Sequence, residues 1–165
     1  MVESVNLSTL VSQAMNLVRV AVPQEIEIRL ALNLDLPEIQ ADRLEMQQIL
    51  MNLVTNAGEA ISAADRGSIT ISTGSEQIAA PFPCSVAGEL KPGRYIFLEV
   101  TDTGCGMDHE IRARMFDPFF TTKFTGRGLG LAAVAGIVRT HRGGISVETA
   151  PACGARFRVL LPADD

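Results

Sequence analysis

Two asparagines in the middle of a predicted helix are the first candidates for chemistry. Asn52 and Asn56 are four residues apart, so they point the same way from successive turns, and Asn56 borders the apolar side of the helix. Asparagine is a poor helix former that favours caps and turns, and its amide oxygen suits a hard cation such as Mg²⁺. Taken alone, the pair fits a solvated polar face at least as well as a cation site.

A carboxylate at the end of a predicted strand is the second candidate. Ile96, Leu98 and Val100 share one face of that strand, and Asp102 comes next with the same parity. If the strand geometry continues, the carboxylate points toward the core, where an unpaired charge is costly. A donor such as the exocyclic amine of adenine would satisfy it. The alternative is an Asx-turn, because Asp followed by Thr-Gly is typical turn chemistry.

Two glycine clusters could bring backbone amides close to an anion. They are Gly104-Cys105-Gly106 and Gly126-Arg127-Gly128-Leu129-Gly130. The second cluster leads directly into a predicted helix, whose N-terminus favours phosphate. It is not a Walker sequence, because no Gly-Lys-Ser/Thr follows, and no strand precedes it as a dinucleotide fingerprint requires.

Between the glycine clusters, the segment Phe116-Asp117-Pro118-Phe119-Phe120 holds three of the eight aromatic residues, which are seven Phe and one Tyr. Thr121, Thr122 and Lys123 follow. One interpretation is a buried aromatic plug. The other is a hinged flap that the aromatic rings anchor, with Lys123 and Arg127 available to phosphate oxygens.

Hydrophobic periodicity predicts the elements that must position these residues. Helices are predicted at Leu7–Val22, from Asp42 to about Ala64 and at Gly130–His141. Strands are predicted at Ile26–Leu34, Ser68–Thr73, Arg94–Thr101, Ile145–Thr149 and Ala155–Leu161, with the last two as a hairpin, a surface loop at 76–93 and a short helical piece within 104–130. Asp42 and Glu45 form a capping box, and the helix from Gly130 is apolar almost all round and therefore expected to be buried.

The strands come in adjacent pairs and do not form a βαβ repeat. The expected fold class is therefore α+β, a two-layer sandwich in which a mixed, mostly antiparallel sheet carries helices on one face. In the predicted strand at Ile26–Leu34, the five alternate apolar residues are expected to face one way, toward the core.

Composition narrows the function classes. The chain has 165 residues, 47% hydrophobic and 20% charged, which is typical of one globular domain. Fourteen Lys and Arg against nineteen Asp and Glu give a net charge of −5, so nucleic acid is not an expected partner. Two histidines are too few for a multi-histidine metal site.

Compartment is predicted from the same composition. Three cysteines without a C-x-x-C pair indicate a reduced, cytoplasmic chain. No apolar run approaches the roughly 20 residues of a membrane helix, and residues 1–20 lack the features of a signal peptide. Membrane contact by this part of the chain is therefore not expected.

Four segments, in this order, resemble the sequence boxes of the ATP-binding catalytic domain of sensor histidine kinases, a family grouped with DNA gyrase B, Hsp90 and MutL. Gln48–Ala60 is similar to the N box, Asp102–Met107 to the G1 box, Phe116–Lys123 to the F box and Gly126–Leu131 to the G2 box. The resemblance covers nearly the whole chain. It implies a Bergerat-type ATP-binding fold over residues 1–165 as a single domain, with an ATP lid at about 107–127 and a loop insertion at about 76–93.

The resemblance also implies roles for individual residues. Asn56 would bind Mg²⁺, with Asn52 helping to hold the metal and the phosphates, and Asp102 would accept a hydrogen bond from the adenine amino group. Gly104 and Gly106 would shape the adenine pocket. The remaining nucleotide-binding set is Met107, Phe119, Lys123, Arg127, Gly128, Leu129 and Gly130. Lys123 would join the two asparagines in catalysis, and the cofactors would be ATP and Mg²⁺.

One position separates the subfamilies that the resemblance covers. In the ATPase relatives a glutamate one turn before the metal-binding Asn activates water, whereas this chain has Asn52 there, and an amide cannot act as a general base. This favours a kinase over a gyrase-, Hsp90- or MutL-type ATPase, which remains an alternative together with a degenerate nucleotide-binding scaffold and an anti-sigma-factor serine kinase. The chain also has Ala155 where family members often have Thr, so a hydrogen bond near the pocket could be absent.

The resemblance implies partners as well. The family phosphorylates a histidine on a separate dimerisation hairpin, and a response regulator receiver domain acts downstream. Neither His109 nor His141 has the surroundings of a phosphoacceptor box. The phosphoacceptor is therefore expected outside this sequence, on another part of a parent kinase that can be membrane-anchored.

Overall fold

The computed structural model describes residues 1–61, 66–84, 86, 89–117 and 130–163. Its helices are α1 (Leu7–Ala21), α2 (Arg43–Ala60), α3 (His109–Arg114) and α4 (Gly130–Thr140). Its strands are β1 (Val2–Val5), β2 (Glu27–Ala31), β3 (Ile39–Asp42), β4 (Ser68–Ile78), β5 (Phe82–Pro83), β6 (Glu89–Leu90), β7 (Gly93–Asp102), β8 (Gly144–Thr149) and β9 (Ala155–Pro162).

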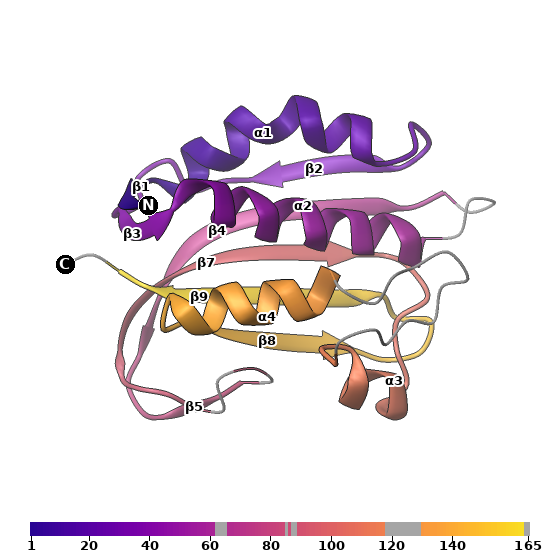
Figure 1. Ribbon diagram of the computed structural model, residues 1–165. Coiled ribbons are helices and arrows are strands. Elements are labelled where there is room, and N and C mark those ends of the chain that lie inside the picture. Colours follow the sequence, from indigo (N-terminus) through magenta and orange to yellow (C-terminus); the bar gives the residue numbers. More distant parts are fainter. Residues whose placement is uncertain (62–65, 85, 87–88, 118–129, 164–165) are drawn as a thin grey trace.

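A five-stranded sheet forms one layer, in the order β2-β4-β7-β9-β8. Its β2–β4 pair is parallel and its other pairs are antiparallel. Helices α1, α2 and α4 form the second layer on one face of this sheet (Figure 1). The expected α+β sandwich with a mixed, mostly antiparallel sheet is confirmed, and so is the closing hairpin of β8 and β9.

Helix α2 begins at the predicted residue, but only the Asp42 half of the capping box forms, because the Asp42 amide donates to His141 and not to Glu45. The Asp42 side chain accepts hydrogen bonds from the amides of Leu44 and Glu45 at 2.9 and 3.2 Å. A hydrogen bond from the Met1 ammonium, together with these amides, lowers the pKa of the Asp42 carboxyl. The helix start is therefore set by local side-chain chemistry that the sequence already displays.

The end of α2 differs from the prediction. The helix stops at Ala60, four residues before the expected Ala64, and Ile61 is already extended. The Ala60 carbonyl accepts a hydrogen bond from the Cys105 amide at 3.0 Å. The last turn is thus tied to a distant loop, which the helical periodicity of residues 42–61 could not indicate.

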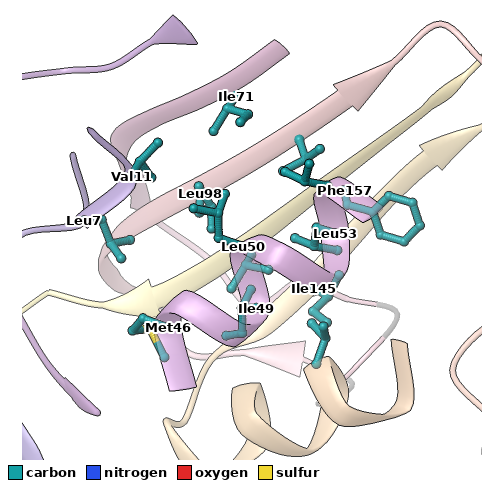
Figure 2. Packing of buried hydrophobic residues seen from close by; sticks show 14 of the residues in the cluster. Leu7, Val11, Met46, Ile49, Leu50, Leu53, Ile71, Leu98, Ile145 and Phe157 are labelled. Atoms are coloured by element: carbon teal, nitrogen blue, oxygen red, sulfur yellow. The ribbon is translucent and has the colours of Figure 1, made fainter. Parts of the chain in front are cut away.

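The core lies between the two layers. Figure 2 shows Met46, Ile49, Leu50 and Leu53 of α2 in one cluster with side chains of α1 and of four strands of the sheet. These are Leu7 and Val11 of α1, Ile71 of β4, Leu98 of β7, Phe157 of β9 and Ile145 of β8. All of them are at most 3% exposed. Helix α2 is therefore the central element of the helical layer.

Two burial predictions were wrong. Helix α4 buries only Val134, Ala135, Ile137 and Val138, because no described element forms a further layer over its outer side. In β2, which is an edge strand, Leu30 is 42% exposed, and Leu34, beyond the end of the strand, is 85% exposed. Apolar composition alone did not distinguish a covered side from an uncovered one.

The predicted loop at 76–93 is partly strand. Strand β4 continues to Ile78 and pairs with the start of β7, and the short strands β5 and β6 pair with each other. On the face of the sheet without helices, the Phe97 ring covers Gly74, and the Arg158 guanidinium lies 4.0 Å from the centre of that ring. Arg158 also pairs with Glu76 and Glu99, both at 2.6 Å. These contacts between strands stabilise the second half of β4, whose polar sequence lacks the alternating apolar residues that predict a strand.

Two further strands have no counterpart in the prediction. β1 and β3 form a separate antiparallel pair, and β3 leads directly into α2. Both are four residues long, which is too short for a period-2 pattern to stand out from the surrounding chain.

Candidate functional site

Asp102 is the last residue of β7 and is 3% exposed. Ile96, Leu98 and Val100 are likewise buried, so the parity prediction is confirmed. The Oδ1 atom of Asp102 accepts the Gly104 amide at 2.8 Å. The two interpretations of this residue are therefore compatible, because the Asx-turn holds a carboxylate that is nevertheless buried.

The two asparagines of α2 are half-buried on successive turns. The Asn52 amide nitrogen donates to the Gly130 carbonyl at 3.2 Å, which ties α2 to the first residue of α4. Asn56 follows one turn later, and Ala60 one turn after that. The second half of α2 is thus bonded to the start of α4 at Asn52 and to the loop after β7 at Ala60.

The loop after β7 needs both of its glycines for packing. A Cβ on Gly104 would lie 2.5 Å from the Ala60 carbonyl oxygen. Gly106 has a φ of +67°, and a Cβ there would collide with the Ala150 carbonyl. Close backbone approach therefore explains this glycine pair without any ligand.

The short helix α3 is fixed to the sheet at two points. Arg112 donates to the Val147 carbonyl at 2.8 Å, and the Phe116 ring packs edge-on against Phe157 with ring centres 6.5 Å apart. The half-buried Phe116 ring is thus anchored on the sheet, as both the plug and the flap interpretations expect. The other predicted members of this segment and of the second glycine cluster, namely Phe119, Lys123, Arg127, Gly128 and Leu129, lie outside the described residues.

One contact of this region was missed by the sequence analysis. The Thr149 hydroxyl, at the end of β8, accepts the Met107 amide at 3.0 Å. The pairing joins residues 42 positions apart. A threonine at the end of a strand gives no signal of such a partner, and only the strand order could have indicated it.

A cleft of about 530 Å³ lies at the opposite end of α2 and α4. It is lined by Val2, Ile39, Gln40, Glu45, Thr140, His141, Arg142, Leu161, Pro162 and Ala163. None of the predicted site residues is among them. We therefore place the candidate site by its hydrogen bonds around Asp102 and Asn52 and not by this cleft.

Two negative findings concern only the described part of the chain. Within it, no three His, Cys, Asp or Glu side chains are grouped so that they could hold a metal ion. Nor does any described helix have the length and apolar content to cross a membrane. The cysteines Cys84, Cys105 and Cys153 are free thiols.

Known proteins resemble both the sequence and the structure. AtoS of Escherichia coli, a signal transduction histidine-protein kinase, is 37% identical over 161 residues, which is 97% of this chain and 24% of AtoS. The sensor histidine kinase ZraS of E. coli K12 is 37% identical over 163 residues, 98% of this chain and 31% of ZraS. The chain thus spans about a quarter to a third of the length of these relatives.

Among solved structures, full-length ShkA in complex with AMPPNP matches with a TM-score of 0.77 at 28% identity, over 98% of this chain and 31% of ShkA. The mycobacterial sensor histidine kinase MprB has the same fold, with a TM-score of 0.76 at 23% identity over 99% of this chain and 98% of that structure. The family model described as histidine kinase-, DNA gyrase B-, and HSP90-like ATPase matches residues 41–165. These matches show that the chain belongs to the histidine kinase-, DNA gyrase B- and HSP90-like ATPase family.

Proposed function

We propose that this chain is the ATP-binding catalytic domain of a two-component sensor histidine kinase. It would present the γ-phosphate of ATP to a phosphoacceptor histidine on a separate hairpin domain, for a receiver domain downstream. The supporting observation is that the buried carboxylate Asp102 and the end of α2 both bond the loop after β7, while Asn52 of the same helix bonds the first residue of α4. The names of the relatives support the choice of kinase within the family.

In this proposal Asp102 recognises the base. Its carboxylate accepts a hydrogen bond from the adenine amino group, while the bond from the Gly104 amide holds it in orientation. A buried carboxylate binds a hydrogen-bond donor more strongly than an exposed one, because water does not compete. Gly104, Gly106 and Met107 form the wall beside the base.

The α2 asparagines face the phosphates in this proposal. Amide oxygens fit Mg²⁺, and the absence of a carboxylate cluster among the described residues agrees with a cation that the nucleotide itself helps to hold. Asn56 would bind the ion. Asn52 would assist it and, through its amide nitrogen, keep the start of α4 in place. Bound ATP·Mg²⁺ supplies the phosphoryl group that is transferred.

The remaining expectations belong to the same proposal. Residues 1–165 form one domain, with an insertion at 76–93 and a lid at about 107–127 that contains α3. In the lid and the second glycine cluster, Phe119, Lys123, Arg127, Gly128, Leu129 and Gly130 bind the nucleotide, and Lys123 joins the asparagines in catalysis. The site of action is the cytoplasm, and the parent kinase can be membrane-anchored.

Calorimetric titration with ATP and Mg²⁺ tests the base assignment. We expect Asp102→Asn to weaken ATP binding by about tenfold or more, because a hydrogen bond to a buried charged group is replaced by one to an amide. Asp35→Asn is the matched control, since Asp35 is an exposed aspartate outside the four sequence boxes. Equal affinity of the Asp102 variant and the unaltered chain would rule out this role of the carboxylate.

Two assays separate the alternatives. Steady-state phosphate release should be slow, because Asn52 cannot act as a general base, and substantial turnover would favour a gyrase-, Hsp90- or MutL-type ATPase.

Labelled phosphate should pass from ATP to a kinase phosphoacceptor hairpin supplied in trans. Tight ATP binding without any transfer would favour a nucleotide-binding scaffold.

A further inference from the structure

A single hydroxyl group at the end of β8 joins two loops of the candidate site. The Thr149 Oγ1 atom accepts the Met107 amide at 3.0 Å and donates to the Gly154 carbonyl at 2.7 Å. Met107 ends the glycine loop that begins at Asp102, and Gly154 ends the turn between β8 and β9. The hydroxyl is thus a hydrogen-bond acceptor for one loop and a donor to the other.

The same two loops are packed directly against each other. The Ala152 amide donates to the Cys105 carbonyl at 2.7 Å. A Cβ on Gly106 would collide with the Ala150 carbonyl, and a Cβ on Gly154, whose φ is +72°, would collide with the Asp102 carbonyl. The turn at 150–154 is therefore the surface on which the glycine loop rests.

The pairing of strands places Thr149 in line with Asp102. Asp102 pairs with Ala155 across β7 and β9, and Ala155 pairs with Thr149 across β9 and β8. The middle residue of this row, Ala155, has no hydrogen-bonding side chain. In the row Asp102–Ala155–Thr149, the hydroxyl group therefore comes from Thr149, which lies two strands away from the Asp102 carboxylate.

We propose that Thr149 is a positioning residue for base recognition, acting through the Met107 amide on the loop that follows Asp102. This inference rests on the proposed function, because it assumes that Asp102 reads the base. Without the hydroxyl, a smaller fraction of molecules has the loop after Asp102 in its binding position. The apparent affinity for ATP falls in proportion to that fraction. A less firmly held Asp102 also distinguishes adenine less well from a base that carries a carbonyl at the same place.

The test compares one substitution that removes the Thr149 hydroxyl with one that keeps it. Thr149→Val keeps the shape and loses both hydrogen bonds, and we expect about fivefold weaker ATP binding with a reduced preference for ATP over GTP. Thr149→Ser keeps the hydroxyl and should stay within about twofold of the unaltered chain. Thr140→Val is the matched control, because that hydroxyl donates to the Ile137 carbonyl at 2.8 Å at the far end of α4. A merely destabilised fold would lower ATP and GTP binding together and would leave their ratio unchanged.

Amide hydrogen exchange provides a readout that does not depend on nucleotide. The Met107 amide should exchange several-fold faster in Thr149→Val than in Thr149→Ser. The inference is overturned if Thr149→Val keeps the ATP-to-GTP preference, or if Thr149→Ser loses as much as Thr149→Val. If the unaltered chain binds no ATP while the Met107 amide still responds, the proposed function fails and only the hydrogen-bonded link between the loops stands.

Discussion

At the scale of single residues, Asp102 both closes a turn and places a buried carboxylate at the end of β7. Its Oδ1 atom closes a turn with the Gly104 amide, and its side chain is nevertheless buried at the end of a core strand. The glycines that follow are likewise required by packing, because a Cβ at Gly104 or Gly106 would meet backbone atoms of other segments. A role in nucleotide binding is therefore proposed for residues that the fold already constrains.

The cysteines allow a residue-scale prediction of pH dependence. Burial, and after it the charge of Glu76, raises the pKa of the Cys84 thiol, whereas Cys105 and Cys153 are exposed. Since the thiolate is the reactive form, Cys84 should be alkylated more slowly at pH 8 than the two exposed cysteines. Its rate should rise at a higher pH than that of free cysteine treated in parallel.

Mass spectrometry of peptides after timed alkylation gives the rate for each cysteine. The burial responsible comes from the apolar cluster of Ile78, Leu90, Tyr95 and Leu160 beside Cys84. Equal rates at all three cysteines would show that this apolar cluster does not cover the Cys84 thiol in solution.

At the scale of elements, α2 and α4 run in opposite directions, and α4 is tied to α2 at both ends of α4. Asn52 bonds the Gly130 carbonyl at one end, and at the other the Asp42 amide donates to Nε2 of His141 at 3.2 Å. The Nδ1 atom of His141 lies 2.8 Å from the Ile137 carbonyl, so it carries the proton and donates. The position of α4 relative to α2 therefore depends on a histidine outside the four sequence boxes.

His141→Ala is expected to lower the free energy of unfolding by about 1–3 kcal/mol, because the Asp42 amide loses its acceptor and the Ile137 carbonyl loses one of its donors. His109→Ala is the matched control, since His109 is the exposed first residue of α3, and it should change stability by less than about 0.5 kcal/mol. Urea denaturation followed by circular dichroism measures both. A His141 variant as stable as the His109 variant would contradict this account of the helix pair.

At the scale of the whole molecule, one core joins the helical layer to the sheet. Leu50 lies at its centre and is 0% exposed, whereas Leu44 on the same helix is 75% exposed. The two positions have the same side chain and the same helical backbone, so a comparison between them isolates the effect of burial.

Leu50→Ala should therefore lower the free energy of unfolding by about 2–5 kcal/mol through the cavity that it leaves. Leu44→Ala should remain within about 0.5 kcal/mol of the unaltered chain. Thermal or urea denaturation gives both values. Similar losses at the two positions would mean that α2 does not pack on the sheet as Figure 2 shows.

The sequence by itself determined the parts that depend on near neighbours. The Asp42 cap, the inward parity of Asp102 and the closing hairpin all follow from residues a few positions apart, and the structure confirms them. Burial was predicted less well, for Leu30 and for the outer side of α4, because composition does not say which side of an element another layer covers.

Only the tertiary structure decided which distant groups meet. The Ala60 carbonyl ends α2 on Cys105, Thr149 holds the Met107 amide 42 residues away, and His141 receives the Asp42 amide from 99 residues away. These partners depend on the strand order β7-β9-β8 and on the antiparallel packing of α2 against α4. Closing the long loops between these groups costs conformational entropy, which the packing of the whole core offsets. No short stretch of sequence therefore encodes such contacts.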